Sequence, residues 1–146
     1  MALLSANEFR GLQRLWVRPF PDSVEPRNIL VVDDEIDFGK ILAATLTKLG
    51  HTVSTATGGR EASAEIARQK FDLVITDLVM PEKEGIELIQ ELATVSPNTR
   101  IIAMSGGGVN ASKSYLKIAG HMGAKAILSK PFSTAELMTA IDEALA

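Results

Sequence analysis

Five short apolar runs alternate along the chain with segments of helical periodicity, and this alternation limits the possible fold more than any other feature. Most of the runs are continuously apolar at their centres, which is typical of strands buried on both faces of a parallel sheet. The pattern therefore predicts an α/β domain with right-handed crossovers and a doubly wound sheet. The predicted strands are residues 29–33, 52–56, 71–77, 100–105 and 125–129.

Helices are expected between these strands. Gly50 follows the apolar periodicity of Phe38 to Leu49 and is placed to end that helix, because glycine readily takes the positive φ of a helix C-terminus. Ser133 and Glu136 have the spacing of a capping box and predict the start of the last helix. The other apolar positions at helical spacing are Ala62, Ile66, Ile86, Ile89 and Ala93.

The first 27 residues have a different pattern, and we assign them to an extension before a main domain of residues 28–146. Apolar residues at helical spacing in this extension predict a short amphipathic helix, which prolines end. A linker through Pro26 follows it. We expect the extension to dock on its own domain or on a second copy in a homodimer, in preference to a membrane. The remaining alternative is that the extension is foreign to the natural protein. Its apolar face comprises Phe9, Leu12 and Trp16, and its basic face Arg10, Arg14 and Arg18.

Composition excludes several classes of protein. The 146 residues carry a net charge of −3 and no cysteine, so a disulfide framework, a thiolate metal site and a cysteine nucleophile are excluded. The mild acidity makes DNA or another nucleic acid an unlikely direct partner, because phosphate binding needs clustered cations. No apolar run approaches the roughly 20 residues of a membrane-spanning helix, so a cytoplasmic location is expected. His51 and His121 are expected in surface loops.

Polar residues follow the apolar runs where the strands should end. Asp33 and Asp34 end the first strand, Asp77 the third, Ser105 the fourth, and Lys130 follows the fifth. Each residue taken alone has an ordinary interpretation as a turn or helix cap. Open parallel sheets, however, bind ligands beyond the carboxyl ends of their strands, so the joint position of these residues favours a functional site.

The chemistry of this set points to a metal and a phosphoryl group. Three neighbouring carboxylates repel one another, and a hard cation such as Mg²⁺ relieves that repulsion through oxygen ligands. Lys130 supplies a positive charge and Ser105 a hydroxyl, and both suit a phosphoryl group. An aspartate in such surroundings can attack phosphorus and become an aspartyl phosphate.

Five motifs follow one another along residues 28–146. They are Ile29 to Glu35, Asp77 to Pro81 with Gly85 after it, Ser105-Gly106, Gly123-Ala124 and Lys130-Pro131-Phe132. With these motifs in this order, residues 28–146 resemble the receiver domain of two-component response regulators. The resemblance implies the flavodoxin-like strand order 2-1-3-4-5 and a cis bond between Lys130 and Pro131.

The resemblance also implies the role of each site residue. Asp77 would be the phosphoacceptor, Ser105 would bond the phosphoryl group, and Lys130 would pair with it. A sensor histidine kinase or a phosphotransfer protein would be the donor, and a downstream protein target would receive the signal by contact. Such a protein is a signal carrier that assists its own phosphorylation and dephosphorylation, and it is not a turnover enzyme. The implied Mg²⁺ ligands are Asp33, Asp34, Asp77 and the backbone carbonyl of Val79.

One position departs from the receiver pattern, because Ile127 stands where receivers usually carry Tyr or Phe. We therefore expect Ile127 to pack passively, and the response to pass through residues 106–110 and the helix after them.

Two other functions are weighed against the signalling switch. A phosphohydrolase of the haloacid dehalogenase type also uses an aspartyl phosphate, but it carries Asp-x-Asp on its first strand, and here the acids are adjacent. An interaction module that is never phosphorylated is disfavoured by the complete acidic set.

Overall fold

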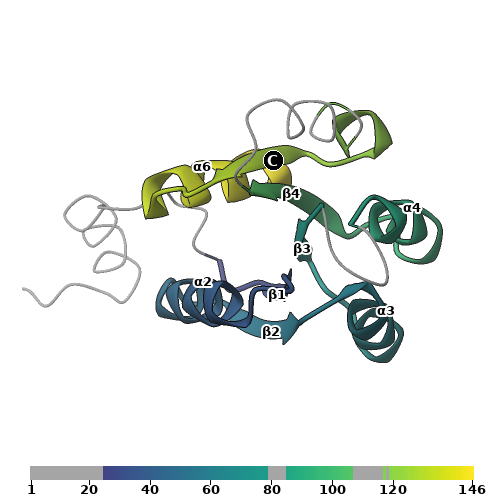
Figure 1. Ribbon diagram of the computed structural model, residues 1–146, viewed down its shortest axis with the longest axis horizontal. Coiled ribbons are helices and arrows are strands. Elements are labelled where there is room, and N and C mark those ends of the chain that lie inside the picture. The colour runs from purple at the N-terminus through teal and green to yellow at the C-terminus, as the bar shows by residue number, and fades with distance from the viewer. Residues whose placement is uncertain (1–24, 79–84, 107–116, 118) are drawn as a thin grey trace, which may run out of the picture.

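The five strands form one parallel sheet in the order β2-β1-β3-β4-β5 (Figure 1). The computed structural model describes residues 25–78, 85–106, 117 and 119–146. The predicted α/β class and strand order are confirmed, and the strand bounds differ from the prediction by at most two residues. The elements are β1 (Asn28–Val32), α2 (Ile36–Lys48), β2 (Thr52–Ala56), α3 (Gly59–Arg68), β3 (Leu73–Asp77), α4 (Gly85–Val95), β4 (Arg100–Gly106), β5 (Ala126–Lys130) and α6 (Thr134–Leu145).

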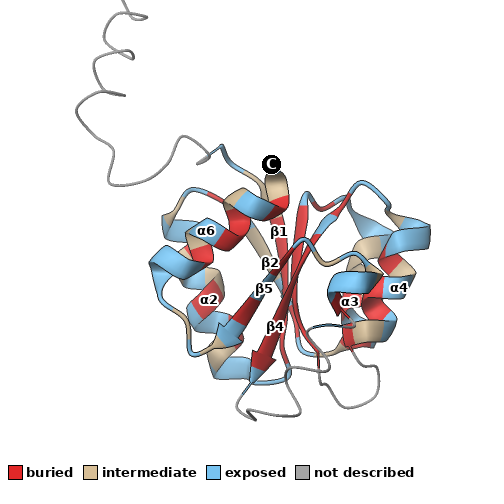
Figure 2. Cartoon of the chain, turned by 90° about the horizontal axis from the view of Figure 1, so that it is seen from above, coloured by how far each residue is buried: buried red, intermediate tan, exposed pale blue. Residues whose placement is uncertain are grey.

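Helices cover both faces of the sheet, with α2 and α6 on one side and α3 and α4 on the other (Figure 2). Successive strand residues point to opposite faces, so Ile29 and Val31 of β1 pack in the core under α2 and α6. Leu30 and Val32 pack in the second core, under α3 and α4. Burial on both faces explains why the central strands are apolar at consecutive positions.

Two predicted helix ends are confirmed. Gly50 has φ +101°, and its N–H donates to the Thr47 carbonyl at 3.0 Å, which closes the end of α2. At the start of α6 the Ser133 Oγ accepts from the Glu136 N–H at 3.1 Å, and the Glu136 Oε1 accepts from the Ser133 N–H at 3.3 Å. The reciprocal bonds satisfy N–H groups that a helix start otherwise leaves unpaired.

His51 corrects the expectation of a surface histidine, because its exposed fraction is only 7%. Its Nδ1 accepts a hydrogen bond from the Arg27 N–H at 3.1 Å, between α2 and β2. The prediction was wrong because this partner is 24 residues away in the chain, and local sequence pattern does not show such a contact. His121 is exposed, as predicted, but it lies in a helical segment and not in a loop.

Some predictions fall outside the described residues. The amphipathic helix in residues 1–24 is one, and most of the segment between β4 and β5 is another, although residues 117 and 119–122 are helical. Among the residues that the structure describes, no helix has the length and apolar character needed to cross a membrane.

Candidate phosphoacceptor and metal site

Charged side chains from three strands meet at one end of the sheet. Asp33 follows β1, Asp77 ends β3, and Lys130 ends β5. The Lys130 Nζ donates to the Asp33 Oδ2 at 2.5 Å and to the Asp77 Oδ2 at 3.0 Å. We call this end the carboxyl end of the sheet; its polar residues are Asp33, Glu35, Asp77, Ser105 and Lys130. The predicted meeting of Asp33, Asp77 and Lys130 is therefore present in the structure.

The strand between Asp77 and Lys130 leaves room for the lysine. Gly106 of β4 is in register with Lys130, and a Cβ placed at Gly106 would lie 3.9 Å from the Lys130 Cδ. The sequence marked Gly106 as part of the Ser105-Gly106 motif. A distance of 3.9 Å is an ordinary contact, so an alanine at this position would also leave room for the lysine.

Burial and pairing act against each other on these charges. The Lys130 side chain is 9% exposed, and burial lowers its pKa, but hydrogen bonds to Asp33 and Asp77 and their charges outweigh burial. The net pKa of Lys130 is therefore raised. For Asp33, burial is the largest effect and raises the pKa, with a further increase from the charge of Asp77. The bonds from Lys130 and from the Glu35 N–H oppose this increase.

Three carboxylates lie close enough to share one cation. One oxygen each of Asp33, Glu35 and Asp77 falls within 4.8 Å of the others, and the Glu35 Oε1 lies 3.8 Å from the Lys130 Nζ. Glu35 was not predicted as a site residue. Strand alternation does not predict its position, because the chain bends at Asp34 and the Glu35 N–H donates back to the Asp33 Oδ1 at 2.9 Å. The signal that could have found Glu35 is its place in the acidic run of residues 33–35.

The other predicted site residues differ in position. Asp34 is exposed and is not one of the three clustered carboxylates. Ser105 is buried near the end of β4, one residue beyond the Met104 that is in register with Asp77. The backbone carbonyl of Val79 lies outside the described residues.

Gly85 packs directly on the backbone of the candidate phosphoacceptor. Its N–H donates to the Leu78 carbonyl at 3.0 Å, and a Cβ at this position would lie 2.0 Å from the Asp77 carbonyl oxygen. Only glycine allows α4 to begin this close to the end of β3. The sequence showed Gly85 as part of a motif, and the structure gives the physical reason for it.

Two aromatic residues that the sequence did not mark as part of the site support the lysine. The Lys130 Nζ lies 4.3 Å from the centroid of the Phe38 ring, a cation–π distance. The Phe132 ring meets Phe38 edge to face, with 5.7 Å between centroids. These rings limit the positions that the lysine can take beside the acids.

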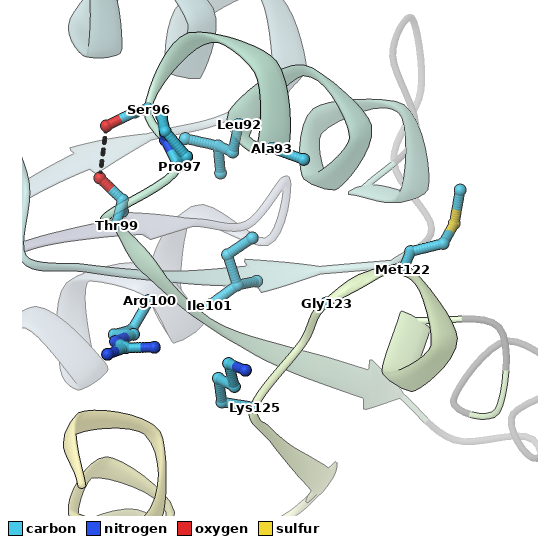
Figure 3. A pocket seen from close by; sticks show the side chains of 10 residues that line it. All are labelled: Leu92, Ala93, Ser96, Pro97, Thr99, Arg100, Ile101, Met122, Gly123 and Lys125. Atoms are coloured by element: carbon cyan, nitrogen blue, oxygen red, sulfur yellow. Dashed lines mark hydrogen bonds between the residues drawn. The ribbon is translucent and has the colours of Figure 1, made fainter.

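A hollow of about 240 Å³ lies at the opposite end of the sheet, where β4 and β5 begin (Figure 3). Its walls include Leu92 and Ile101, and the Ser96 and Thr99 hydroxyls are bonded to each other at 2.7 Å. Among the residues that the structure describes, no carboxylate lines this hollow. The chemistry predicted from the strand ends is therefore separate from it.

Comparison with known proteins identifies a matching family. The model of the response regulator receiver domain matches residues 29–142. The chemotaxis protein CheY of Thermotoga maritima is 35% identical over 118 residues, which cover 80% of this chain and 96% of that protein. The transcriptional regulatory protein GlrR of Escherichia coli is 37% identical over 123 residues, 84% of this chain. This chain spans only 27% of the length of GlrR.

Solved structures agree in fold. The chemotaxis response regulator CheY4 of Vibrio cholerae matches with a TM-score of 0.73 and 28% identity, over 83% of this chain and all of that one. NtrX from Brucella abortus matches with a TM-score of 0.77 and 29% identity, over 83% of this chain and 27% of that one.

Proposed function

Because this chain belongs to the response regulator receiver domain family of two-component signalling, we propose that it is a switch controlled by phosphorylation of Asp77. The phosphoryl donor would be the phosphohistidine of a sensor histidine kinase or of a phosphotransfer protein. The observation that carries the proposal is the buried Lys130 ammonium, bonded to Asp77 and Asp33 from two other strand ends. Family membership removes the alternative of a dehalogenase-type phosphohydrolase.

The side chains present suit transfer of a phosphoryl group. A carboxylate oxygen of Asp77 attacks phosphorus, the new P–O bond forms, and the P–N bond of the phosphohistidine breaks. The electron pair leaves with the imidazole, which takes up a proton. The Lys130 ammonium, 3.0 Å from the Asp77 Oδ2, offsets negative charge on the phosphoryl oxygens. The Ser105 hydroxyl is the proposed hydrogen-bond donor to the same group.

The acidic residues fit a hard divalent cation. Carboxylate oxygens within 4.8 Å of one another are suitable ligands for Mg²⁺, and their mutual repulsion favours its binding. We propose Asp33, Asp77 and the Val79 carbonyl as ligands, with Asp34 or Glu35 as the further acid. Bound Mg²⁺ would neutralise charge between the carboxylates and the phosphoryl oxygens.

The output is proposed to be a changed contact with a downstream protein in the cytoplasm. GlrR is named as a transcriptional regulatory protein and CheY as a chemotaxis protein, so relatives of this chain act in different processes. Ile127 on β5 is 41% exposed and stands three residues before Lys130. An isoleucine without ring or hydroxyl is proposed to pack passively while neighbouring backbone carries the response.

Phosphorylation is tested by incubating the protein with Mg²⁺ and a small acyl phosphate, then locating added phosphate by peptide mass. We expect one phosphoryl group on Asp77 and none in Asp77→Asn, which is nearly isosteric. Phosphate on another residue of that variant would reject the assignment. A parent protein that takes up no phosphate would instead support the unphosphorylated interaction module.

The fourth metal ligand is tested by comparing two adjacent variants. Millimolar Mg²⁺ is expected to raise the melting temperature of the parent protein, since it binds the folded acidic cluster. Asp34→Ala and Glu35→Ala each remove one negative charge, so both should reduce the increase in melting temperature by a similar electrostatic effect. The variant that also removes a metal ligand should lose more of the increase than the other. If Mg²⁺ does not change the melting temperature of the parent, the cluster is not a metal site.

A further inference from the structure

We propose that a groove between α2 and α6 is the docking site for residues 5–18 of the same chain. The groove encloses about 180 Å³. Its lining is mainly apolar and includes Phe38, Ile41, Leu42, Phe132 and Leu137. The two helices lie on the same side of the sheet (Figure 2).

The groove leaves a large apolar side chain in water. Ile41 is 67% exposed, although it is on the wall of the groove, in the middle of α2. An isolated exposed isoleucine is ordinary, but here it adjoins a groove whose lining includes Phe38 and Phe132. An apolar cavity of about 150 Å³ accommodates a benzene molecule, so this groove has room for one aromatic side chain.

The N-terminal segment supplies side chains of the required kind. The sequence predicts an amphipathic helix with Phe9, Leu12 and Trp16 on one face. The other face carries arginines at positions 10, 14 and 18. A helix with these two faces can place one aromatic side chain in the groove, lay its other apolar side chains along the groove walls and keep its arginines in water.

Charge around the groove complements those arginines. Glu35 and Asp37 are exposed at the start of α2, and Glu136 is exposed at the start of α6. Two of these acids, Asp37 and Glu136, directly precede the groove residues Phe38 and Leu137. Lys40 is also exposed on α2, so the attraction is strongest at the helix starts.

The linker is long enough to reach the groove. Arg27 lies where β1 begins, and its carbonyl accepts from the Thr52 N–H at 2.9 Å. Residues 19–26 extend to as much as about 28 Å, whereas the length of β1 is about 17 Å. A helix over residues 5–18 would be about 21 Å long, close to the length of α2. The segment can therefore lie along α2 in the same molecule.

An occupant of the groove would lie close to the phosphoacceptor site. It would contact Phe38, whose ring faces the Lys130 Nζ at 4.3 Å, and Lys130 bonds Asp77. The docking itself rests on the groove and on the sequence pattern. Any control of access to Asp77 rests in addition on the proposed function, so docking is tested without phosphorylation.

Trp16 is the only tryptophan and reports the docking directly. In the full chain we expect acrylamide quenching of Trp16 to be several-fold weaker than in a peptide of residues 1–27. Ile41→Lys should raise the quenching to the peptide value. Val95→Lys on α4 is the matched control, because Val95 is 60% exposed and is not on the groove wall. Equal quenching in the parent and the peptide would overturn the proposal.

Crosslinking identifies the occupant, and the absence of native cysteines makes it selective. One cysteine at position 9, 12 or 16 is paired with Ile41→Cys or, as the control, with Val95→Cys. Oxidation should give a monomeric disulfide with position 41 for at least one of the three positions and none with position 95. Disulfide-linked dimers would assign the groove to a second copy and overturn docking within one chain. A Trp16 that becomes protected only with anionic lipid vesicles, or no crosslink at all, would also overturn it.

Discussion

At the carboxyl end of the sheet one buried lysine holds two carboxylates, whereas at the opposite end the polar side chains are bonded mainly to backbone. We call this opposite end the amino end of the sheet; its polar residues are Arg27, Asn28, His51, Asp72 and Thr99. The Asp72 Oδ2 accepts from the Asn28 N–H at 2.8 Å. The Thr99 Oγ1 donates to the Phe71 carbonyl at 2.8 Å, and the His51 Nδ1 accepts from the Arg27 N–H.

The difference separates structural roles from chemical ones. Bonds from side chains to backbone at the amino end join neighbouring chain segments, and the two charged residues there, Arg27 and Asp72, have opposite signs. At the carboxyl end, three clustered carboxylates face the ammonium of Lys130. The clustered residues therefore carry an excess of negative charge where the cation and the phosphoryl group are proposed to bind.

Removing the lysine should produce the largest effect. Lys130→Met keeps a long apolar side chain against Phe38 but leaves Asp33 and Asp77 without their ammonium partner. We expect a loss of about 3 kcal/mol in the free energy of unfolding, because a buried charge loses its partner. Mg²⁺ should restore part of the loss by occupying the same acidic cluster. Urea unfolding with and without Mg²⁺ measures both quantities.

Thr99→Val provides the control at the amino end. It removes the hydrogen bond to the Phe71 carbonyl and should cost about 1 kcal/mol. That loss should be the same with and without Mg²⁺. If Lys130→Met cost no more than Thr99→Val, or showed no response to Mg²⁺, the contrast between the two ends would not hold.

Close packing at the carboxyl end should give the next largest effect. In Gly85→Ala the new Cβ would meet the Asp77 carbonyl oxygen and the Leu78 backbone, so α4 or β3 must shift. We expect a loss of about 2 kcal/mol in the free energy of unfolding. Thermal and urea unfolding of the purified variant check this value.

Gly120→Ala is the matched control for that substitution. A Cβ at Gly120 would lie 4.0 Å from the Ile127 Cδ1, an ordinary contact, and position 120 is helical. The control should be neutral or stabilising by up to about 1 kcal/mol. Equal losses in both variants would show that the proximity of Gly85 to Asp77 has no energetic consequence.

Local pattern predicted the positions of the strands and therefore most of the carboxyl end. Buried parallel strands need consecutive apolar residues, so the residue after each run marks a strand end. Asp33, Asp77 and Lys130 could be predicted together on that ground. The strand order came from the resemblance, because periodicity within one strand does not determine which strand lies beside it.

Contacts between distant segments could not be predicted in this way. Phe38 lies against Lys130 and Phe132, which are 92 and 94 residues later in the chain. Glu35 is a different case, since it belongs to the same acidic run as Asp33 and Asp34 and could have been considered with them. The burial of His51 was not predicted, because local sequence pattern does not show which distant chain segment packs over a loop residue.

The smallest expected effect is a pH dependence at the amino end. The His51 Nδ1 must be unprotonated to accept the Arg27 N–H. Burial lowers the pKa of His51, and the charge of Arg27, which is paired with Glu25 at 3.4 Å, lowers it further. The folded state therefore binds fewer protons than the unfolded state, so stability falls as the pH drops through the ordinary histidine pKa of about 6.5.

His51→Asn separates this contribution from that of the other titrating groups. An asparagine Oδ1 can take the place of Nδ1 as acceptor for the Arg27 N–H, but it does not titrate. Between about pH 7.5 and about pH 5.5, where few carboxylates titrate, the parent should lose more of its free energy of unfolding than the variant. Urea unfolding at both pH values measures the difference. Equal losses would mean that burial and the charge of Arg27 do not hold His51 neutral, whereas a greater loss in the variant would reverse the sign derived from the buried imidazole.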